Sequence, residues 1–434
     1  MAGDQALPRI HWVSPLPPAE TDIAAYTLRV LPALRARAEV VLWTDAERWD
    51  PAIERLAPVR RYDAGAHFPM PLDGLAPMAR GAEIAVFHIG NSWLYHAGPL
   101  NLARRVPGIV VFHDLGLQDL LRGCLEHGHF DAPVYLEEMG RWYGSEGRVL
   151  AEQVVGDGIR PHRAAARMPG FEIAFRSAVA AMTHTRAGVA ALAARARLPV
   201  YGLDLPFEPG PHPGATRASS GPLRLVQFGY IGQNRRLEAV LDAIAAVEPR
   251  VDARLDIFGT LWDRPFVEAR IRALGLGERV VVRGFVSEDE LDAALARAHL
   301  VFNLRNPSMG EASGSQLRIW NAAAAAVVSD LGWYAGLPDE TVFKVPAEGE
   351  AAALAEVLVR LDRDRGRGAA VGEAGRARLD ARHRPERYAD GLLRVAAAYA
   401  QDARDGLLAD AGRRVLGEMP SPGLARRCLA DRLG

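Results

Sequence analysis

The sequence has little cysteine and almost no lysine. Its 434 residues include two cysteines, Cys124 and Cys428, which are too few for a disulfide framework and lack the spacing of metal-ligand pairs. A reducing, cytoplasmic setting is therefore the expectation. Lys344 is the one lysine, so arginine carries nearly all of the positive charge. With so much alanine, this composition indicates a GC-rich bacterial genome rather than a particular function.

Long apolar runs and a strong net charge are also missing. Residues 1–8 lack the basic start and the apolar core of a signal peptide. No apolar run approaches the roughly 18 residues that a membrane span needs, so we expect any membrane association to be peripheral. The formal net charge of −1 excludes a strong general attraction to nucleic acid or to anionic membranes.

What the chain does contain is the composition of a globular protein. Hydrophobic residues make up 49% and charged residues 24% of the sequence. A chain of 434 residues is too long for one ordinary core, so we expect two domains. The segment 207–222, rich in Pro, Gly, Ser and His, predicts the linker between them.

The first domain alternates strands and helices. Thr21 or Asp22 can cap a helix over 23–37, and the Pro-rich loop before it lies where open α/β sheets bind ligands. Residues 115–167 are expected to be helical and irregular, and no role follows from them. Apolar runs predict strands at 9–13, 39–43, 84–91, 108–114, 178–185 and 199–202.

Polar side chains follow two of these strands. Asn91 ends one strand, with His96 just beyond it, and His113 and Asp114 end the next. Two interpretations stay open for each histidine. His113 either lines a ligand site or pairs locally with Asp114, and His96 either contacts a ligand or packs inside the domain.

No metal or nucleotide-cofactor motif is present. His127 and His129 are one residue apart, a spacing far more typical of a solvated turn than of a metal site, so we assign no metal. The chain contains no Gly-x-Gly-x-x-Gly and no Gly-Lys-Ser/Thr. A dinucleotide fingerprint and a P-loop are therefore both excluded.

The second domain opens with a loop that suits a phosphate. A strand at 223–229 is followed by Gly229 and Gly232 and then by a helix with Arg235 and Arg236 at its start. Cations at that end oppose the helix dipole, so we prefer an anion-binding role over a solvated arginine pair. Further strands are predicted at 254–259, 280–284 and 342–345, with helices at 266–274, 287–298, 350–365 and 384–400 and a helical tail without an assigned role at 401–434.

The most informative stretch is the loop at 303–315, between an apolar strand at 300–302 and a helix. Ser313 or Ser315 can cap this helix, and the free N–H groups at its start suit a phosphate or another anion. Glu311 is the only carboxylate in the loop. It either binds sugar hydroxyls or merely favours the helix dipole.

This stretch carries a resemblance to a known family. The run at 305–313, with 324–330, Gly332-Trp333-Tyr334 and Leu337-Pro338, resembles the donor-site segment of retaining family 4 glycosyltransferases. It is most similar to a bacterial subgroup with an Arg…Pro…Gly-Glu…Ser donor loop. The resemblance implies the GT-B architecture, an α/β fold of two facing, Rossmann-like, doubly wound parallel-sheet domains whose C-terminal helices cross back. The domains implied are an N-terminal acceptor-side domain at 1–206, the linker at 207–222, a donor domain at 223–375, and C-terminal helices and tail at 376–434.

The resemblance also implies residue roles. Glu311 would hold donor-sugar hydroxyls, Arg235 would neutralise the donor diphosphate, and His113 would line the cleft near the donor sugar. The other donor-binding candidates are Gly232, Asn234, Arg236, Phe285, Val286, Gly310, Ala312, Ser313 and Gly314. The acceptor-side candidates are Asn91, His96 and Asp114. Phe285 has a core role as its alternative.

The implied activity is transfer of a sugar from a nucleoside diphosphate sugar, with retention at the anomeric carbon, to a glycan or lipid-linked acceptor. Bacterial polysaccharide or glycan biosynthesis is the implied setting, in the cytoplasm or peripherally at the inner face of the membrane. The donor is a substrate, and no cofactor, metal or nucleic acid is expected.

Two departures from the family pattern keep other functions open. Many relatives carry a second Glu eight positions after Glu311 that grips the ribose, and here that position is Ile319. Relatives usually have Gly where Thr21 or Asp22 stands. A catalytically silent relative that serves as a binding or scaffold subunit is therefore the alternative. A sugar-nucleotide epimerase ranks lower, because no convincing pair of acidic groups stands out.

Overall fold

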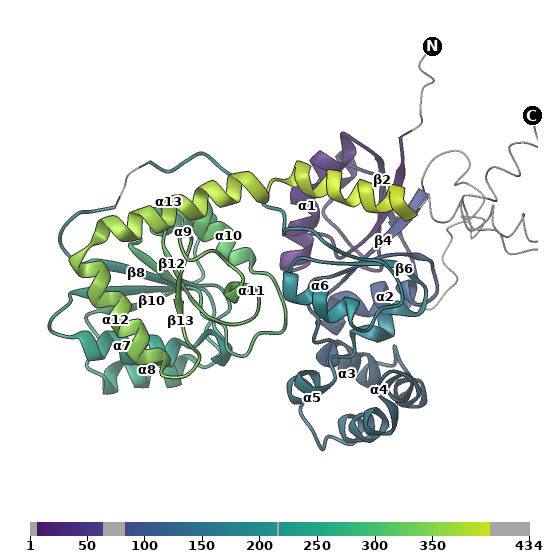
Figure 1. The fold of residues 1–434 in the computed structure, drawn as a ribbon, viewed down its shortest axis with the longest axis horizontal. Helices are drawn as coiled ribbons and strands as arrows, with labels where there is room; N and C mark the ends of the chain where they lie inside the picture. Colours follow the sequence, from purple (N-terminus) through teal and green to yellow (C-terminus); the bar gives the residue numbers. More distant parts are fainter. Residues whose placement is uncertain (1–6, 64–82, 215–216, 400–434) are drawn as a thin grey trace, which may run out of the picture. The chain divides into compact units, whose positions relative to one another are not determined.

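The computed structural model describes residues 7–63, 83–214 and 217–399, so Cys428 and the tail predicted at 401–434 lie outside the described residues. The chain divides into two units, which are described separately. Unit 1 comprises the described residues up to 184, then 188–203 and 385–399, and unit 2 comprises 185–187 and 204–384. Each unit is built around one parallel sheet with helices on its faces (Figure 1).

The sheet of unit 1 has seven strands in the order β3-β2-β1-β4-β5-β6-β7, and all of its pairs are parallel. Its central strands are buried along almost their whole length, as expected for a parallel sheet covered on both faces. The strands are β1 (Arg9–Val13), β2 (Glu39–Thr44), β3 (Val59–Arg61), β4 (Glu83–Ile89), β5 (Gly108–Phe112), β6 (Ala178–Thr183) and β7 (Val200–Gly202).

The helices of the N-terminal half include a group inserted between β5 and β6. Helices α3, α4 and α5 of this group lie together beside the sheet (Figure 1). A further helix, at 385–399, belongs to unit 1 although it follows unit 2 in the chain. The helices are α1 (Asp22–Arg35), α2 (Trp93–Ala103), α3 (Gln118–Glu126), α4 (Ala132–Val155), α5 (Pro161–Arg167) and α6 (Arg186–Ala193).

The sheet of unit 2 has six parallel strands in the order β10-β9-β8-β11-β12-β13. Helices α7, α8 and α12 cover one face, and α9, α10 and α13 cover the other (Figure 1). The strands are β8 (Leu223–Phe228), β9 (Ala253–Phe258), β10 (Val280–Gly284), β11 (Leu300–Phe302), β12 (Ala326–Ser329) and β13 (Phe343–Val345). The helices are α7 (Leu237–Val247), α8 (Arg264–Ala273), α9 (Glu288–Arg297), α10 (Gly314–Asn321), α11 (Gly332–Ala335), α12 (Glu350–Arg363) and α13 (Arg365–Arg382).

The predicted fold class is confirmed, since the chain forms two Rossmann-like parallel-sheet units. The predicted strands agree with the structure to within one or two residues at most ends. Within the described residues, no helix is both long and apolar enough to cross a bilayer.

The described parts of the segment expected to be a linker, 207–214 and 217–222, instead belong to unit 2. Phe207 N donates to the carbonyl of His383 at 2.6 Å, and Gly210 N donates to Oδ1 of Asn321 at 2.9 Å. Arg376 Nη2 donates in turn to the carbonyl of Gly210 at 2.6 Å. The boundaries between the units therefore fall at 203/204 and at 384/385 rather than at 206 and 375.

Candidate donor site

Two loops meet at the carboxyl edge of the unit 2 sheet. One follows β8 and the other follows β11, and these two strands are paired neighbours. The loops are joined directly, because Asn306 N donates to the carbonyl of Asn234 at 2.9 Å. The carboxyl edge of an open parallel sheet is where α/β proteins bind ligands.

The β8 loop sends two successive arginines to different partners. Gly229 has a φ of 102° and turns the chain at the end of β8, which a residue with a side chain would strain to do. A short 3₁₀ turn at Gln233–Arg235 follows. Arg235 Nη1 donates to Oδ1 of Asn303 at 2.9 Å, whereas Arg236 Nε donates to Oε2 of Glu350 at 2.7 Å.

Asn303 connects the β8 loop to the start of α10. Its Oδ1 receives the Arg235 guanidinium, and its Nδ2 donates to Oε1 of Gln316 at 2.9 Å and to Oγ of Ser313 at 3.3 Å. Ser313 Oγ also accepts from Gln316 N at 3.1 Å and so caps α10, which agrees with one of the two predicted caps. Arg235 is only 9% exposed, so the hydrogen bonds of this network, and not contact with solvent, fix its position.

Glu311 is held by its own loop. Arg305 Nε lies 3.0 Å from its Oε1, while Met309 N at 2.6 Å and Ser308 Oγ at 3.2 Å donate to its Oε2. These donors offset the carboxylate charge beside the helix start. They also fix its direction and leave lone pairs that a hydroxyl group can meet.

The start of α10 is open. A Cβ built on Gly314 would meet no atom within 4 Å, and Gly310, in the same loop, has a φ of 87°. The space beside Gly314 is therefore available to a ligand at this helix N-terminus, where an anion is favoured, whereas Ser313 is only 3% exposed.

Phe285, one of the donor-binding candidates, is 90% exposed, which excludes the alternative that it is a core residue. Val286 beside it packs partly against the apolar cluster of the β12 face. Ile319 lies in that same cluster and is fully buried, so the position of the second family Glu presents no side chain to a ligand.

In unit 1, His113 is paired with another histidine. Its Nε2 lies 3.0 Å from Nδ1 of His88, and its ring makes an edge contact with Tyr26 at 4.9 Å between ring centroids. Burial lowers the pKa of His113 well below its usual value, and the neighbouring His184 and His88 lower it further. His113 is therefore neutral near pH 7.

The acceptor-side candidates are held inside unit 1. Asn91 N donates to Oδ2 of Asp114 at 2.9 Å, and Asn91 Nδ2 donates to Oδ2 of Asp119 at 3.0 Å. These bonds tie the end of β4 to the region of α3. His96 is buried with Nδ1 3.0 Å from the His88 carbonyl, and burial lowers its pKa to about 4. Contact of these residues with an acceptor stays a prediction.

Several residues of the site were not predicted. Asn303 and Gln316 are polar side chains at the end of a buried strand and inside a helix, and a buried polar residue in such a place is the signal that could have identified them. Arg305 was recognised as part of the motif, but its pairing with Glu311 across a loop cannot be read from spacing.

Comparison with known proteins gives the class. Residues 223–364 match the family model described as Glycosyl transferases group 1. No curated protein matches the sequence significantly. Among solved structures, Anabaena Alr3699/HepE in complex with UDP is 14% identical, with 90% of this chain and 100% of that chain covered and a TM-score of 0.59.

Two further structures have the same fold. Sucrose-phosphate synthase from Thermosynechococcus elongatus is 17% identical over 91% of this chain and 98% of that one, with a TM-score of 0.56. WaaG, a glycosyltransferase involved in lipopolysaccharide biosynthesis, is 16% identical over 88% and 98%, with a TM-score of 0.54. The two units thus have the predicted GT-B fold, and the match to the group 1 glycosyltransferase model lies within unit 2.

Proposed function

We propose that this protein is a retaining glycosyltransferase that transfers a sugar from a nucleoside diphosphate sugar to an acceptor. The observation that carries the proposal is the pair of joined loops at the carboxyl edge of the unit 2 sheet. They bring a fixed arginine, an open helix N-terminus and an oriented carboxylate to one place. The group 1 match over the same residues supports the same chemistry.

Each group has a role in this proposal. The bond between the anomeric carbon and the diphosphate oxygen breaks, and negative charge develops on the leaving diphosphate. Arg235 and the N–H groups at the start of α10 stabilise that charge. Glu311 accepts hydrogen bonds from the donor sugar. The acceptor oxygen bonds to the anomeric carbon on the face that the diphosphate leaves, and the leaving phosphate takes the acceptor proton, so no protein nucleophile or base is assigned.

The remaining parts of the proposal concern the acceptor, the cellular location, the need for a metal ion and the donor. A glycan or lipid-linked acceptor of bacterial polysaccharide assembly is the proposed partner, with the enzyme in the cytoplasm or peripheral to the membrane. The reaction is proposed to need no metal ion, and equal rates with and without a chelator would support this. Because structures similar to this chain were solved with UDP and UDP-glucose, UDP-sugars come first among the donors to test.

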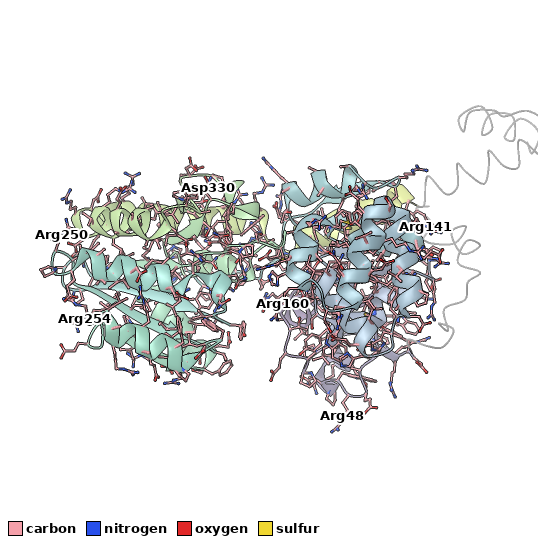
Figure 2. The ribbon with its side chains drawn as sticks, turned by 90° about the horizontal axis from the view of Figure 1, so that it is seen from below. Arg48, Arg141, Arg160, Arg250, Arg254 and Asp330 are labelled. Carbon is pink, nitrogen blue, oxygen red and sulfur yellow. The ribbon has the colours of Figure 1, made fainter. Side chains whose placement is uncertain are left out.

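Donor binding is tested by thermal unfolding with UDP-, GDP-, ADP- and dTDP-sugars. A ligand at one hundred times its dissociation constant stabilises the folded state by about 2.7 kcal/mol, which raises the midpoint visibly. We expect a shift with one nucleotide family and its loss in Arg235→Ala. The matched control is Arg250→Ala, since Arg250 lies at the outer surface of unit 2 beyond the far end of α7 (Figure 2). No shift with any donor would contradict the proposal.

The second candidate, a silent GT-B protein that binds without transfer, is favoured by the burial of Ile319. Product analysis separates the two. A transferase consumes the stabilising donor when an acceptor glycan is present, whereas a silent relative binds it and leaves it intact. An epimerase would change the sugar without an acceptor.

A further inference from the structure

Unit 2 contains a cavity of about 510 Å³ on the face covered by α7, α8 and α12. This volume falls within the range of about 300–1,000 Å³ that is typical of small-molecule sites. The cavity is lined by the first turns of α7 and α12, by α8 and by the segment after β9. Gly232, Gln233 and Arg236 of the β8 loop line the cavity, as does Glu350, the ion-pair partner of Arg236, and the other residues described above for the candidate donor site lie outside it.

One wall of the cavity is aromatic. Trp262 and Phe266 contact each other with ring centroids 5.3 Å apart and ring planes tilted by 44°. Phe266 is 41% exposed although it lies in a helix whose neighbouring Val267 is buried. Two adjoining aromatic rings that remain accessible in a concave place form an apolar platform that a ligand can contact.

Other side chains that line the cavity are polar and already paired. Arg236 Nε contacts Oε2 of Glu350 at 2.7 Å, and Arg270 Nη2 contacts Oδ1 of Asp242 at 2.5 Å. Glu350 is itself buried and receives Ser329 Oγ at 3.2 Å. Arg270 Nε has no hydrogen-bond partner among the described residues. These side chains thus offer fixed donors and acceptors, and the charges within each pair compensate one another.

This combination selects a class of ligand. An anion is disfavoured, because the cavity is lined by two arginines that are both paired and by three carboxylates, those of Glu238, Asp242 and Glu350. An acyl chain is disfavoured by the cost of covering ion pairs with an apolar surface. A neutral ring with one apolar face and several hydroxyl groups suits both the aromatic and the paired polar side chains of the lining.

From this geometry we infer that the cavity is a second saccharide-binding site. The ring stacks its C–H face on Trp262 and Phe266, and its hydroxyls bond to the Asp242–Arg270 and Arg236–Glu350 pairs. The site is separate from the proposed donor site and shares only the β8 loop with it. In that loop Arg236 faces the cavity while Arg235 turns to Asn303, so an occupied cavity contacts the backbone that positions Arg235.

The probes are maltotriose and cellotriose, two neutral trisaccharides whose linkages have opposite anomeric configurations. Each is titrated into the full chain without any nucleotide sugar. Saturation-transfer NMR and calorimetry measure binding. We expect at least one of the two to bind, with a dissociation constant at least tenfold weaker in Trp262→Ala. Trp49→Ala, which removes a partly buried indole from unit 1, is the matched control and should bind as the wild type does.

Two further variants and two competing ligands complete the test. If Trp262→Ala lowers the unfolding midpoint, Phe266→Ala and Asp242→Asn, which alter partly exposed side chains, replace it and should also weaken binding. A saturating amount of UDP should not displace the trisaccharide, and inorganic phosphate should not compete. Absence of binding by both sugars, unchanged affinity in all three variants, displacement by UDP, or competition by phosphate would each overturn the inference. The result is independent of donor turnover, so failure of the proposed function would leave it standing.

Discussion

Asn303 is the residue on which the candidate donor site most depends. It is 2% exposed and serves three partners, with its carbonyl oxygen toward Arg235 and its amide toward Ser313 and Gln316. An amide is suited to this place because it accepts on one side and donates on the other. Because this side chain is buried and bonded to protein groups, we expect it to position other groups rather than to contact the donor.

Asn303→Ala should therefore affect both stability and binding. It leaves the buried guanidinium of Arg235 and the buried oxygen of Gln316 without this partner, which costs about 1–3 kcal/mol for each unsatisfied group. Urea unfolding measures the loss of stability, and titration with the stabilising donor measures the loss of affinity.

Asn303→Asp separates the two effects. A carboxylate still accepts from Arg235 but cannot donate to Ser313 or Gln316. We expect this variant to retain more donor affinity than Asn303→Ala at a similar cost in stability. Equal donor affinity in wild type, Asn303→Ala and Asn303→Asp would show that Arg235 needs no positioning by this residue.

At the scale of elements, α13 is a helix whose sequence has a low helix propensity. Its 18 residues include Gly366, Gly368, Gly372 and Gly375. Each glycine costs about 1 kcal/mol relative to alanine in a helix interior. Close packing offsets this cost. A Cβ on Gly372 would lie 2.0 Å from the Ala323 carbonyl oxygen, and a Cβ on Gly375 would lie 2.1 Å from the Trp320 ring. The glycines let α13 approach α10 closely.

Gly375→Ala should accordingly destabilise the protein despite the better helix propensity of alanine. The added methyl group collides with a fully buried indole, and such overpacking costs about 1–3 kcal/mol. The matched control is Gly140→Ala in α4, where the nearest atom to the new Cβ is 3.9 Å away, and it should be neutral or slightly stabilising. The free energy of unfolding of both variants, measured with denaturant, tests this prediction. Equal stability of the two would refute the close-packing role.

These elements also indicate what could be predicted from the sequence. Strands such as β5 and β10 were placed well, because a run of β-branched residues between turn residues is a local signal. The cap at Ser313 was local too. Helix α2, which contains Gly98 and Pro99, was missed, since long-range packing overrides its weak propensity. The Asn303 network joins residues far apart in sequence, so no spacing rule reveals it.

At the scale of the whole molecule, stability should depend on pH through the histidines buried in unit 1. Burial lowers the pKa of His88 and His113 well below the usual value and that of His96 to about 4. The unfolded chain binds these protons near pH 6.5, whereas the folded chain resists them. Their contribution is therefore fully present above about pH 6.5 and is lost as the pH falls toward the folded pKa.

His96 alone should cost about 2 kcal/mol at pH 5 relative to pH 7.5. Unfolding midpoints measured between pH 7.5 and 4.5 should fall steadily, and His96→Gln should show a shallower decline. His162→Gln, at an exposed position in α5, serves as the control and should keep the wild-type slope. A flat profile over this range would contradict the prediction.

The return of residues 385–399 to unit 1 also has a consequence for synthesis on the ribosome. Apart from 185–187, unit 2 is a single stretch of chain, so it can close its core as soon as residue 384 has emerged. Unit 1 must wait for its last helix, whose Tyr388 packs on Tyr26 and whose Asp390 pairs with Arg37. The half of the chain made first is thus the half completed last, and its apolar surface stays open to chaperones throughout the translation of unit 2.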